Sequence, residues 1–177
     1  MMRTLVLLIL GFALAACSRA PEAAPATPPE VQRLLDEAEI VKLASALDAA
    51  VDRKDWAAAR ASFEDEVDVD FSSLGGTPSR ITATGLVGNW QTALTPEKQS
   101  FHLRGDPVVT ITGDAATMVS HGYTWNRLTT RKGDDLWEIW GVYEYRFARA
   151  PQGWRISGMK FVKTYERGDP SVRSGAE

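Results

Sequence analysis

The chain has 177 residues, of which 44% are hydrophobic, so it is long enough for one domain with a complete hydrophobic core. Its 23 acidic residues outnumber its 20 basic residues, and the net charge of −3 argues against a nucleic-acid-binding surface. A single cysteine excludes a disulfide framework within the chain, so packing must supply the stability of the fold.

The N-terminus has the pattern of a secretory signal peptide. Arg3 provides a positive charge, and an apolar run from Leu5 to Leu14 follows it. This run is shorter than the roughly 20 residues that span a bilayer. The sequence Leu14-Ala15-Ala16-Cys17 resembles the bacterial lipobox, in which the cysteine is acylated and becomes the first residue of the mature protein. We therefore expect residues 1–16 to be removed and Cys17 to be lipidated; the alternative is an ordinary signal peptide with an incidental cysteine.

Lipidation would anchor the protein to a membrane without a spanning helix. A lipidated Cys17 predicts a location in the cell envelope, facing the periplasm, and Ser18 after it favours the outer membrane by resemblance to lipoproteins of this type. Residues 17–29 are rich in alanine and proline and are expected to form a tether between the membrane and the folded domain. Residues 168–177 are expected to form a flexible C-terminal tail.

Two helices are expected after the tether. Thr27 is placed to cap the first helix, and Pro28 suits its first turn. Apolar residues then recur at helical spacing to about Val51. Asp55 is placed to cap a second, short helix over Trp56–Phe63.

The pattern then changes to that of a sheet. Residues Glu66–Phe71 alternate strictly between polar and apolar side chains, which predicts a half-buried strand. A glycine-rich loop and a third, amphipathic helix over Thr84–Leu94 are predicted next. Four long strands, separated by residues typical of turns, complete the chain: Gln99–Thr112, Ala115–Arg131, Leu136–Ala148 and Gly153–Glu166.

Helices followed by an antiparallel meander predict the α+β class. Long strands in a small domain must twist strongly. With about three N-terminal helices packed on one side, we expect them to form a cone-shaped, strongly curved antiparallel sheet. The expected domain covers residues 30–167, and its concave side could hold a small molecule.

Six segments, in this order, carry a resemblance to a known family: Leu47–Trp56, Val67–Phe71, Phe101–Leu103, Gly113–Thr117, Gly141–Glu144 and Gly153–Ile156. Together they resemble the SnoaL-like domain of the nuclear-transport-factor-2-like superfamily, also described as scytalone-dehydratase-like or cystatin-like. The resemblance implies a cone-shaped α+β barrel with an apolar pocket. Members include cyclases, isomerases, dehydratases and proteins that only bind or act as scaffolds, so the fold alone assigns no activity.

The resemblance also implies a candidate catalytic pair. Asp52, four residues before Trp56, and His102, at the opening of a strand, match the aspartate and histidine of the scytalone-dehydratase-like pattern. His102 would act as a general base on an acidic C–H group, and Asp52 would orient it. The alternative is structural: Asp52 caps the turn between two helices, and His102 is a hydrogen-bonded residue at the end of a strand.

Other positions of that pattern are filled differently. Val51 and Phe71 stand where the dehydratases have pocket tyrosines, and the second catalytic histidine would fall near Asn126 or Arg127. The incomplete set argues against the dehydratase reaction itself.

Aromatic side chains predict the lining of the pocket. Alternation places His121 on the same strand face as Tyr123 and Trp125, which predicts a buried or pocket-lining histidine. On the next strand, alternation separates Tyr143 from Glu144 without deciding which of them faces the concave side. Core packing is one interpretation of these residues. The other is a pocket for a small apolar or aromatic molecule, with these candidate residues: Trp90, His121, Tyr123, Trp125, Tyr143 and Glu144.

No cofactor or metal is expected. The two histidines lie far apart and have no cysteine partner, so they lack the spacing of a zinc site. Gly75-Gly76 is not followed by the Lys-Ser/Thr of a phosphate-binding loop.

Three functional hypotheses remain. We favour an envelope lipoprotein that binds a small apolar molecule. The first alternative is a general acid–base isomerase, cyclase or dehydratase. The second is an interaction module that forms homodimers through the outer sheet face, where Trp140 and Val142 would lie.

Overall fold

The computed structural model describes residues 27–128 and 135–174. The expected signal peptide, Cys17 and most of the expected tether lie outside the described residues, so these expectations stay predictions. Within the two described ranges, no helix combines the length and the apolar character needed to cross a membrane.

Three helices precede the long strands, as expected: α1 (Pro29–Asp52), α2 (Trp56–Ala61) and α3 (Ala83–Ala93). Asp55 caps α2 as predicted, because its side chain accepts a hydrogen bond from the backbone N–H of Ala58 at 3.1 Å. The predicted cap of α1 is wrong. Its N-cap residue is Pro28, and no side chain, that of Thr27 included, caps this helix.

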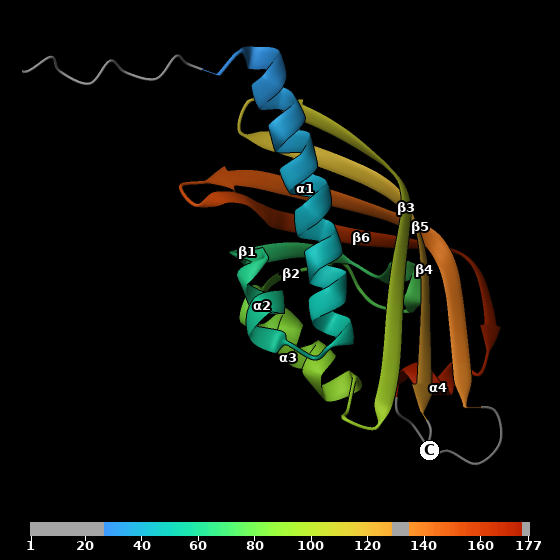
Figure 1. Cartoon of the computed structure of the whole chain (residues 1–177). Helices are drawn as coiled ribbons and strands as arrows, with labels where there is room; N and C mark the ends of the chain where they lie inside the picture. Colours follow the sequence, from blue (N-terminus) through green and yellow to red (C-terminus); the bar gives the residue numbers. More distant parts are fainter. Residues whose placement is uncertain (1–26, 129–134, 175–177) are drawn as a thin grey trace, which may run out of the picture.

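Helix α1 lies along the sheet, with α2 and α3 near its C-terminal end (Figure 1). From Ile40 onward the helix supplies core residues, such as Ile40 and Leu47, which are almost fully buried. Its first turns do not: Leu34 and Leu35 are more than half exposed. Only the second half of the apolar pattern in α1 therefore faces the core.

Six strands form one sheet in the order β2-β1-β6-β5-β4-β3, and together with the helices they confirm the α+β class. Strands β3 to β6 are antiparallel neighbours, as predicted. Their bounds, with those of the two shorter strands, are β1 (Phe63–Asp70), β2 (Ser79–Thr82), β3 (Lys98–Thr112), β4 (Ala115–Leu128), β5 (Leu136–Ala150) and β6 (Gly153–Gly168).

The sheet is mixed rather than wholly antiparallel, because β1 pairs in parallel with β6. On its other side β1 pairs with β2, a strand that the sequence does not predict. β2 has four residues, of which only Ile81 is a large apolar side chain, so alternation carries no signal there. The local sequence pattern predicts neither of these two strand pairings, because each is set by how the whole chain folds.

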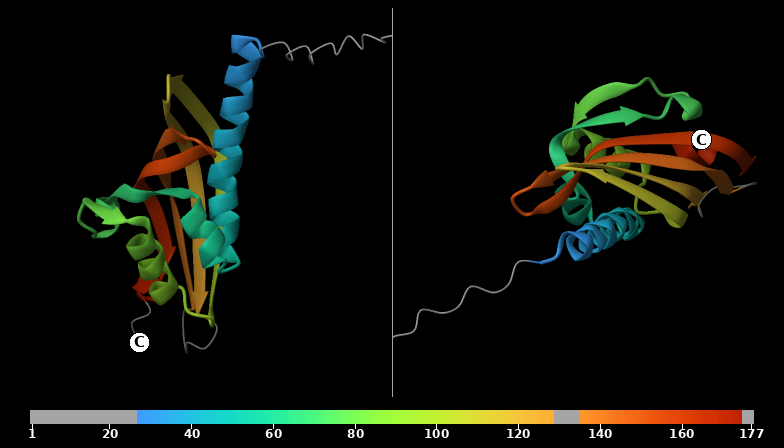
Figure 2. Two further views of the ribbon diagram at one scale, coloured as in Figure 1. Left: turned by 90° about the vertical axis from the view of Figure 1, so that its left-hand side faces the viewer. Right: turned by 90° about the horizontal axis from the view of Figure 1, so that it is seen from above.

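The sheet is curved (Figure 2), and two glycines allow close packing of aromatic rings on it. A Cβ atom on Gly122 would lie 2.3 Å from Cε2 of Tyr143, and one on Gly141 would lie 2.5 Å from Cζ of Phe161. The glycines thus let two rings lie directly against the backbone of neighbouring strands. A register irregularity between Trp140 and Gly141 accompanies this bend.

The C-terminal segment differs from the expected tail over its described part. After β6, a short helix α4 (Ser171–Ser174) forms, and the side chain of Val172 is fully buried. Lys98 Nζ donates a hydrogen bond to the carbonyl oxygen of Arg173 at 2.9 Å. The chain as far as α4 is therefore part of the packed domain, and residues 175–177 lie outside the described residues.

Candidate functional site

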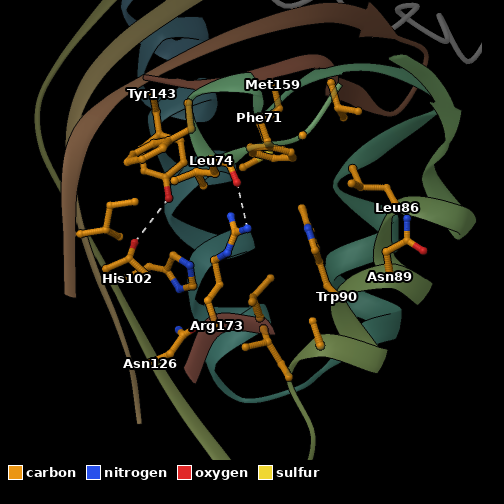
Figure 3. Close-up of a pocket in the computed structure, with 18 of the residues that line it drawn as sticks. Phe71, Leu74, Leu86, Asn89, Trp90, His102, Asn126, Tyr143, Met159 and Arg173 are labelled. Atoms are coloured by element: carbon orange, nitrogen blue, oxygen red, sulfur yellow. Dashed lines mark hydrogen bonds between the residues drawn. The ribbon is translucent and has the colours of Figure 1, made fainter. Parts of the chain in front are cut away.

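A cavity of about 500 Å³ opens on the concave side of the sheet, next to α1 and α3 (Figure 3). This volume is in the range typical of small-molecule sites. Its wall is mostly apolar and aromatic, formed in large part by Leu47, Val51, Val69, Phe71, Leu86, Trp90, Ile139, Tyr143, Met159 and Phe161. Two of the predicted pocket residues, Trp90 and Tyr143, line it.

Asp52 and His102 meet at the wall of this cavity. His102 Nδ1 lies 2.7 Å from Asp52 Oδ1, and the backbone N–H of His102 donates to Asp52 Oδ2 at 2.8 Å. The hydroxyl of Ser100 donates to the same carboxylate at 3.0 Å. Both side chains of the pair are 18% exposed. His102 lines the cavity, and Asp52 stands behind it.

A tight turn brings the two residues together. Asp52 is the last residue of α1, and Lys54 just after it has a positive φ of 58°, which reverses the chain. Lys54 Nζ then donates to the carbonyl oxygen of Lys98 at 2.7 Å and so ties this turn to the first residue of β3. His102 follows four residues later on the same strand, which places its ring beside Asp52.

The hydrogen bonds of Asp52 determine how His102 is oriented. Burial would raise the pKa of Asp52, but the hydrogen bonds and charge of His102, helped by Ser100, outweigh burial and hold that pKa below its ordinary value. The carboxylate is therefore ionised at neutral pH and can only accept. Nδ1 of His102 must then carry the proton that it donates. In the neutral ring, Nε2 is left with a lone pair on the other side of the imidazole.

Beside this pair lies a buried arginine that sequence reasoning missed. Arg104 donates to Asp48 Oδ1 at 2.6 Å and also contacts the hydroxyl of Tyr145. Its guanidinium lies over the Tyr143 ring, 4.1 Å from the ring centroid. Burial raises the pKa of Tyr143, so its hydroxyl stays protonated at neutral pH. The spacing of Asp48 and Asp52, one helical turn apart on α1, is the one sequence signal that could have linked these two pairs.

Four predicted pocket residues lie on the opposite, outer face of the sheet. His121 is 74% exposed and has Asp106 as its neighbour, while Glu144 pairs with Lys160. Tyr123 packs against Trp140. Trp125 stacks on Phe101, and neither of these two belongs to the cavity wall. The placement of these four in the pocket is therefore wrong.

The reason lies in the sheet register. Tyr123 stands opposite Trp140, whereas Tyr143 stands opposite Ser120, so the two tyrosines project from different faces. On β4 the residues that face the cavity are Thr124 and Asn126. The alternation of side chains along a strand correctly assigns them to two faces, but it does not tell which face lies on the concave side of the sheet.

Further polar side chains line the cavity, among them Asn89, Asn126 and Arg173 (Figure 3). Asn126 Nδ2 donates to the backbone oxygen of Trp125 at 2.9 Å, which fixes its amide group. Among residues 27–128 and 135–174, no three His, Cys, Asp or Glu side chains are grouped as a metal site would need. The arrangement thus offers an apolar space with a histidine base, an amide and a cation at its wall.

Residues 32–160 match the family model of the SnoaL-like domain. No curated protein matches the sequence.

Solved structures share the fold. The Kfla4162 protein from Kribbella flavida is 25% identical, with a TM-score of 0.75 over 80% of this chain and 98% of that one. An NTF2-like protein with a cystatin-like fold from Novosphingobium aromaticivorans is 21% identical, with a TM-score of 0.61 over 76% and 85%. A hexachlorocyclohexane dehydrochlorinase (LinA) is 16% identical, with a TM-score of 0.65 over 79% and 93%.

Proposed function

The chain belongs to the SnoaL-like domain family, and from this premise we propose that it binds a small apolar or aromatic molecule in its cavity and removes a proton from it with His102. The distance of 2.7 Å between His102 Nδ1 and Asp52 Oδ1, at the wall of an apolar cavity, carries this proposal.

Binding is supported by the size and chemistry of the cavity. A space of about 500 Å³ lined mainly by aromatic and aliphatic side chains favours ligands that are themselves apolar. Trp90 and Phe71 stand on the side of the cavity away from His102 (Figure 3). A flat ring held against them would lie within the same enclosed space as the imidazole.

Proton transfer is supported by the orientation of His102. Asp52 accepts a hydrogen bond from Nδ1–H, so the neutral ring keeps a lone pair on Nε2 for an acidic C–H group of the ligand. In an isomerisation the proton returns to another carbon. In an elimination the C–H electron pair forms a double bond while a leaving group departs from the neighbouring carbon with its own electron pair. The hexachlorocyclohexane dehydrochlorinase named above has the same fold, a likeness that extends to the fold alone.

The test uses 2-tetralone, an apolar bicyclic ketone with acidic C–H groups, as the probe. Exchange of its α protons in D₂O, followed by NMR, reports general-base activity without knowledge of the natural substrate. We expect the wild-type protein to accelerate exchange and H102Q to lose the acceleration. H121Q is the matched control, because His121 is the other histidine of the chain and lies on the outer face.

Binding of the same probe is measured separately by thermal shift. Binding without accelerated exchange would support a binding protein and reject His102 as a base. Absence of binding by 2-tetralone and by matched apolar rings would reject both parts of the proposal. Equal loss of exchange in H121Q and H102Q would also contradict the role of His102.

We further propose that this domain is anchored in the cell envelope through lipidated Cys17, with the outer membrane favoured over the inner. Mass spectrometry of the mature N-terminus in a bacterial host should detect a diacylated cysteine as the first residue. The wild-type protein should partition into detergent on phase separation and C17S into water. An unmodified N-terminus at any other residue would contradict this proposal.

A second copy of the chain is proposed as a partner on the outer sheet face. Phe101, Leu103 and Val119 on this face are 41–55% exposed, and Trp140 and Val142 lie on the same face. Light scattering should detect a dimer for the wild-type protein and a monomer for L103E/V119E. A wild-type monomer at high concentration would contradict the proposal.

A further inference from the structure

Arg173 brings a positive charge to one end of the cavity. Its side chain extends from α4 into the space between His102 and Trp90 (Figure 3). Arg173 also lines an adjoining, more polar cavity of about 440 Å³, whose wall includes Ser73 and Lys163. The guanidinium thus stands at the border between an apolar compartment and a polar one.

This charge has no carboxylate partner among the described residues. The one hydrogen bond that its guanidinium makes there runs to the carbonyl oxygen of Leu74, at 2.9 Å. The charge of Arg173 helps to lower the pKa of Glu166, but Glu166 already accepts from Lys163 Nζ at 2.6 Å and from Trp137 Nε1 at 3.2 Å. As far as residues 27–128 and 135–174 are concerned, most of the N–H donors of Arg173 therefore stay available to a ligand.

The other charged groups at the wall are already matched. Asp48 is bound by Arg104, and Asp52 is bound by His102. Within the described part of the chain, the cavity wall consequently presents one cation that no carboxylate binds directly, against a mainly apolar lining. A negative group of a ligand would be attracted there more strongly than in water, because the apolar wall screens the charge less.

Arg173 is held in position rather than left in solvent. Val172, the residue before it, is fully buried, and Lys98 Nζ holds the carbonyl oxygen of Arg173 at 2.9 Å. Its guanidinium carbon lies 5.8 Å from the centroid of the Trp137 ring. A preorganised arginine loses little freedom when it binds, which increases the affinity gained from each contact.

We propose that the ligand of this cavity carries a carboxylate on an apolar ring, and that Arg173 pairs with this carboxylate while the ring fills the space in front of His102. The inference rests on the proposed function and names its ligand class as small aromatic or alicyclic carboxylic acids. The planar guanidinium suits a carboxylate because two parallel N–H···O bonds can form.

The test compares acids with neutral amides of the same shape. The probes are 2-naphthoate with 2-naphthamide, and cyclohexanecarboxylate with its carboxamide, bound at pH 7 to the exported protein carrying C17S. We expect the wild-type protein to bind at least one acid about tenfold or more tightly than its amide, as a charge-assisted hydrogen bond implies. R173Q should abolish this ratio by weakening the binding of the acid more than that of the amide. R33Q is the matched control, because Arg33 lies near the exposed start of α1.

The outcomes separate this inference from the proposed function. Equal binding of acid and amide by the wild-type protein would overturn the role of Arg173 and leave the apolar cavity as a binding site. Absence of binding by every acid and amide would overturn both. A preference for acids that survives in R173Q would also overturn the inference. If R173Q fails to fold, equal binding of acid and amide by the wild-type protein still overturns the inference, and R173K, which keeps the charge without the planar fork, takes the place of R173Q and should lower the ratio.

Discussion

One carboxylate, that of Asp52, binds both the imidazole and the backbone amide of His102, at 2.7 and 2.8 Å. The contact joins the end of α1 to the first part of β3 across a separation of 50 residues. The same two hydrogen bonds therefore orient the candidate base and connect two elements of the fold, so substitutions at Asp52 should change both stability and chemistry.

The first prediction concerns this contact. D52N should lower the free energy of unfolding by about 1–3 kcal/mol, because an amide has one acceptor oxygen for three donors and leaves at least one partner unsatisfied. S100A, which removes only one of the three donors, should cost about 0.5–1.5 kcal/mol. Chemical denaturation measures both. Equal losses in the two variants would contradict the central role of Asp52.

The second prediction concerns acid stability. Two hydrogen bonds from Arg149, at 3.0 and 2.7 Å, lower the pKa of Asp36 to about 2, although burial opposes them. The folded pKa is thus below the ordinary value of 3.8, so the stabilisation is complete above pH 3.8 and disappears as the pH falls through about 2. It amounts to about 2 kcal/mol.

Denaturation between pH 5 and pH 2 measures this effect. The wild-type protein should lose more stability over this interval than D36N, which has no charge to lose at that position. Parallel pH profiles for the two proteins would mean that Asp36 does not contribute to acid stability.

The third prediction compares two glycines. G122A should destabilise the fold by about 1–3 kcal/mol, because the new Cβ would lie 2.3 Å from the ring of Tyr143, and that ring would have to leave its contact with Phe161. G88A should do the opposite. Gly88 is inside α3 with nothing within 4 Å of a new Cβ, so alanine should add about 0.5–1 kcal/mol of stability. Thermal unfolding of both variants tests the pair, and a stable G122A would contradict the close packing seen here.

The fourth prediction concerns the buried ion pair of Asp48 and Arg104, whose side chains are 11% and 7% exposed. D48L or R104M alone should cost about 3–5 kcal/mol, because each leaves the partner charge buried without compensation. The double variant D48L/R104M should recover most of this loss. A double-mutant cycle measures the coupling, and additive losses would show that the two side chains act independently.

Much of the fold was predictable from local pattern. The cap at Asp55, the third helix and the four long strands follow from residue types and spacing within a few residues of each other. The parallel pairing of β1 with β6 was not predictable, because no local pattern records which strand will close against which.

The candidate site, like the fold, was predictable from the sequence only in part. Asp52 and His102 could be named from a resemblance, but their contact required the turn at Lys54 and its bond to Lys98. His121 and Tyr123 were assigned to the wrong face of β4. Arg173 gave no signal at all, since it lies in a segment that looked like a tail.

The sequence by itself determined the type and order of the elements, because helical and strand periodicity and turn chemistry act over short distances along the chain. Only the tertiary structure decided which face of the sheet became concave and which polar groups share its cavity. Period-two alternation is symmetric between the two faces of a strand, and this symmetry is broken only when helices pack on one of them.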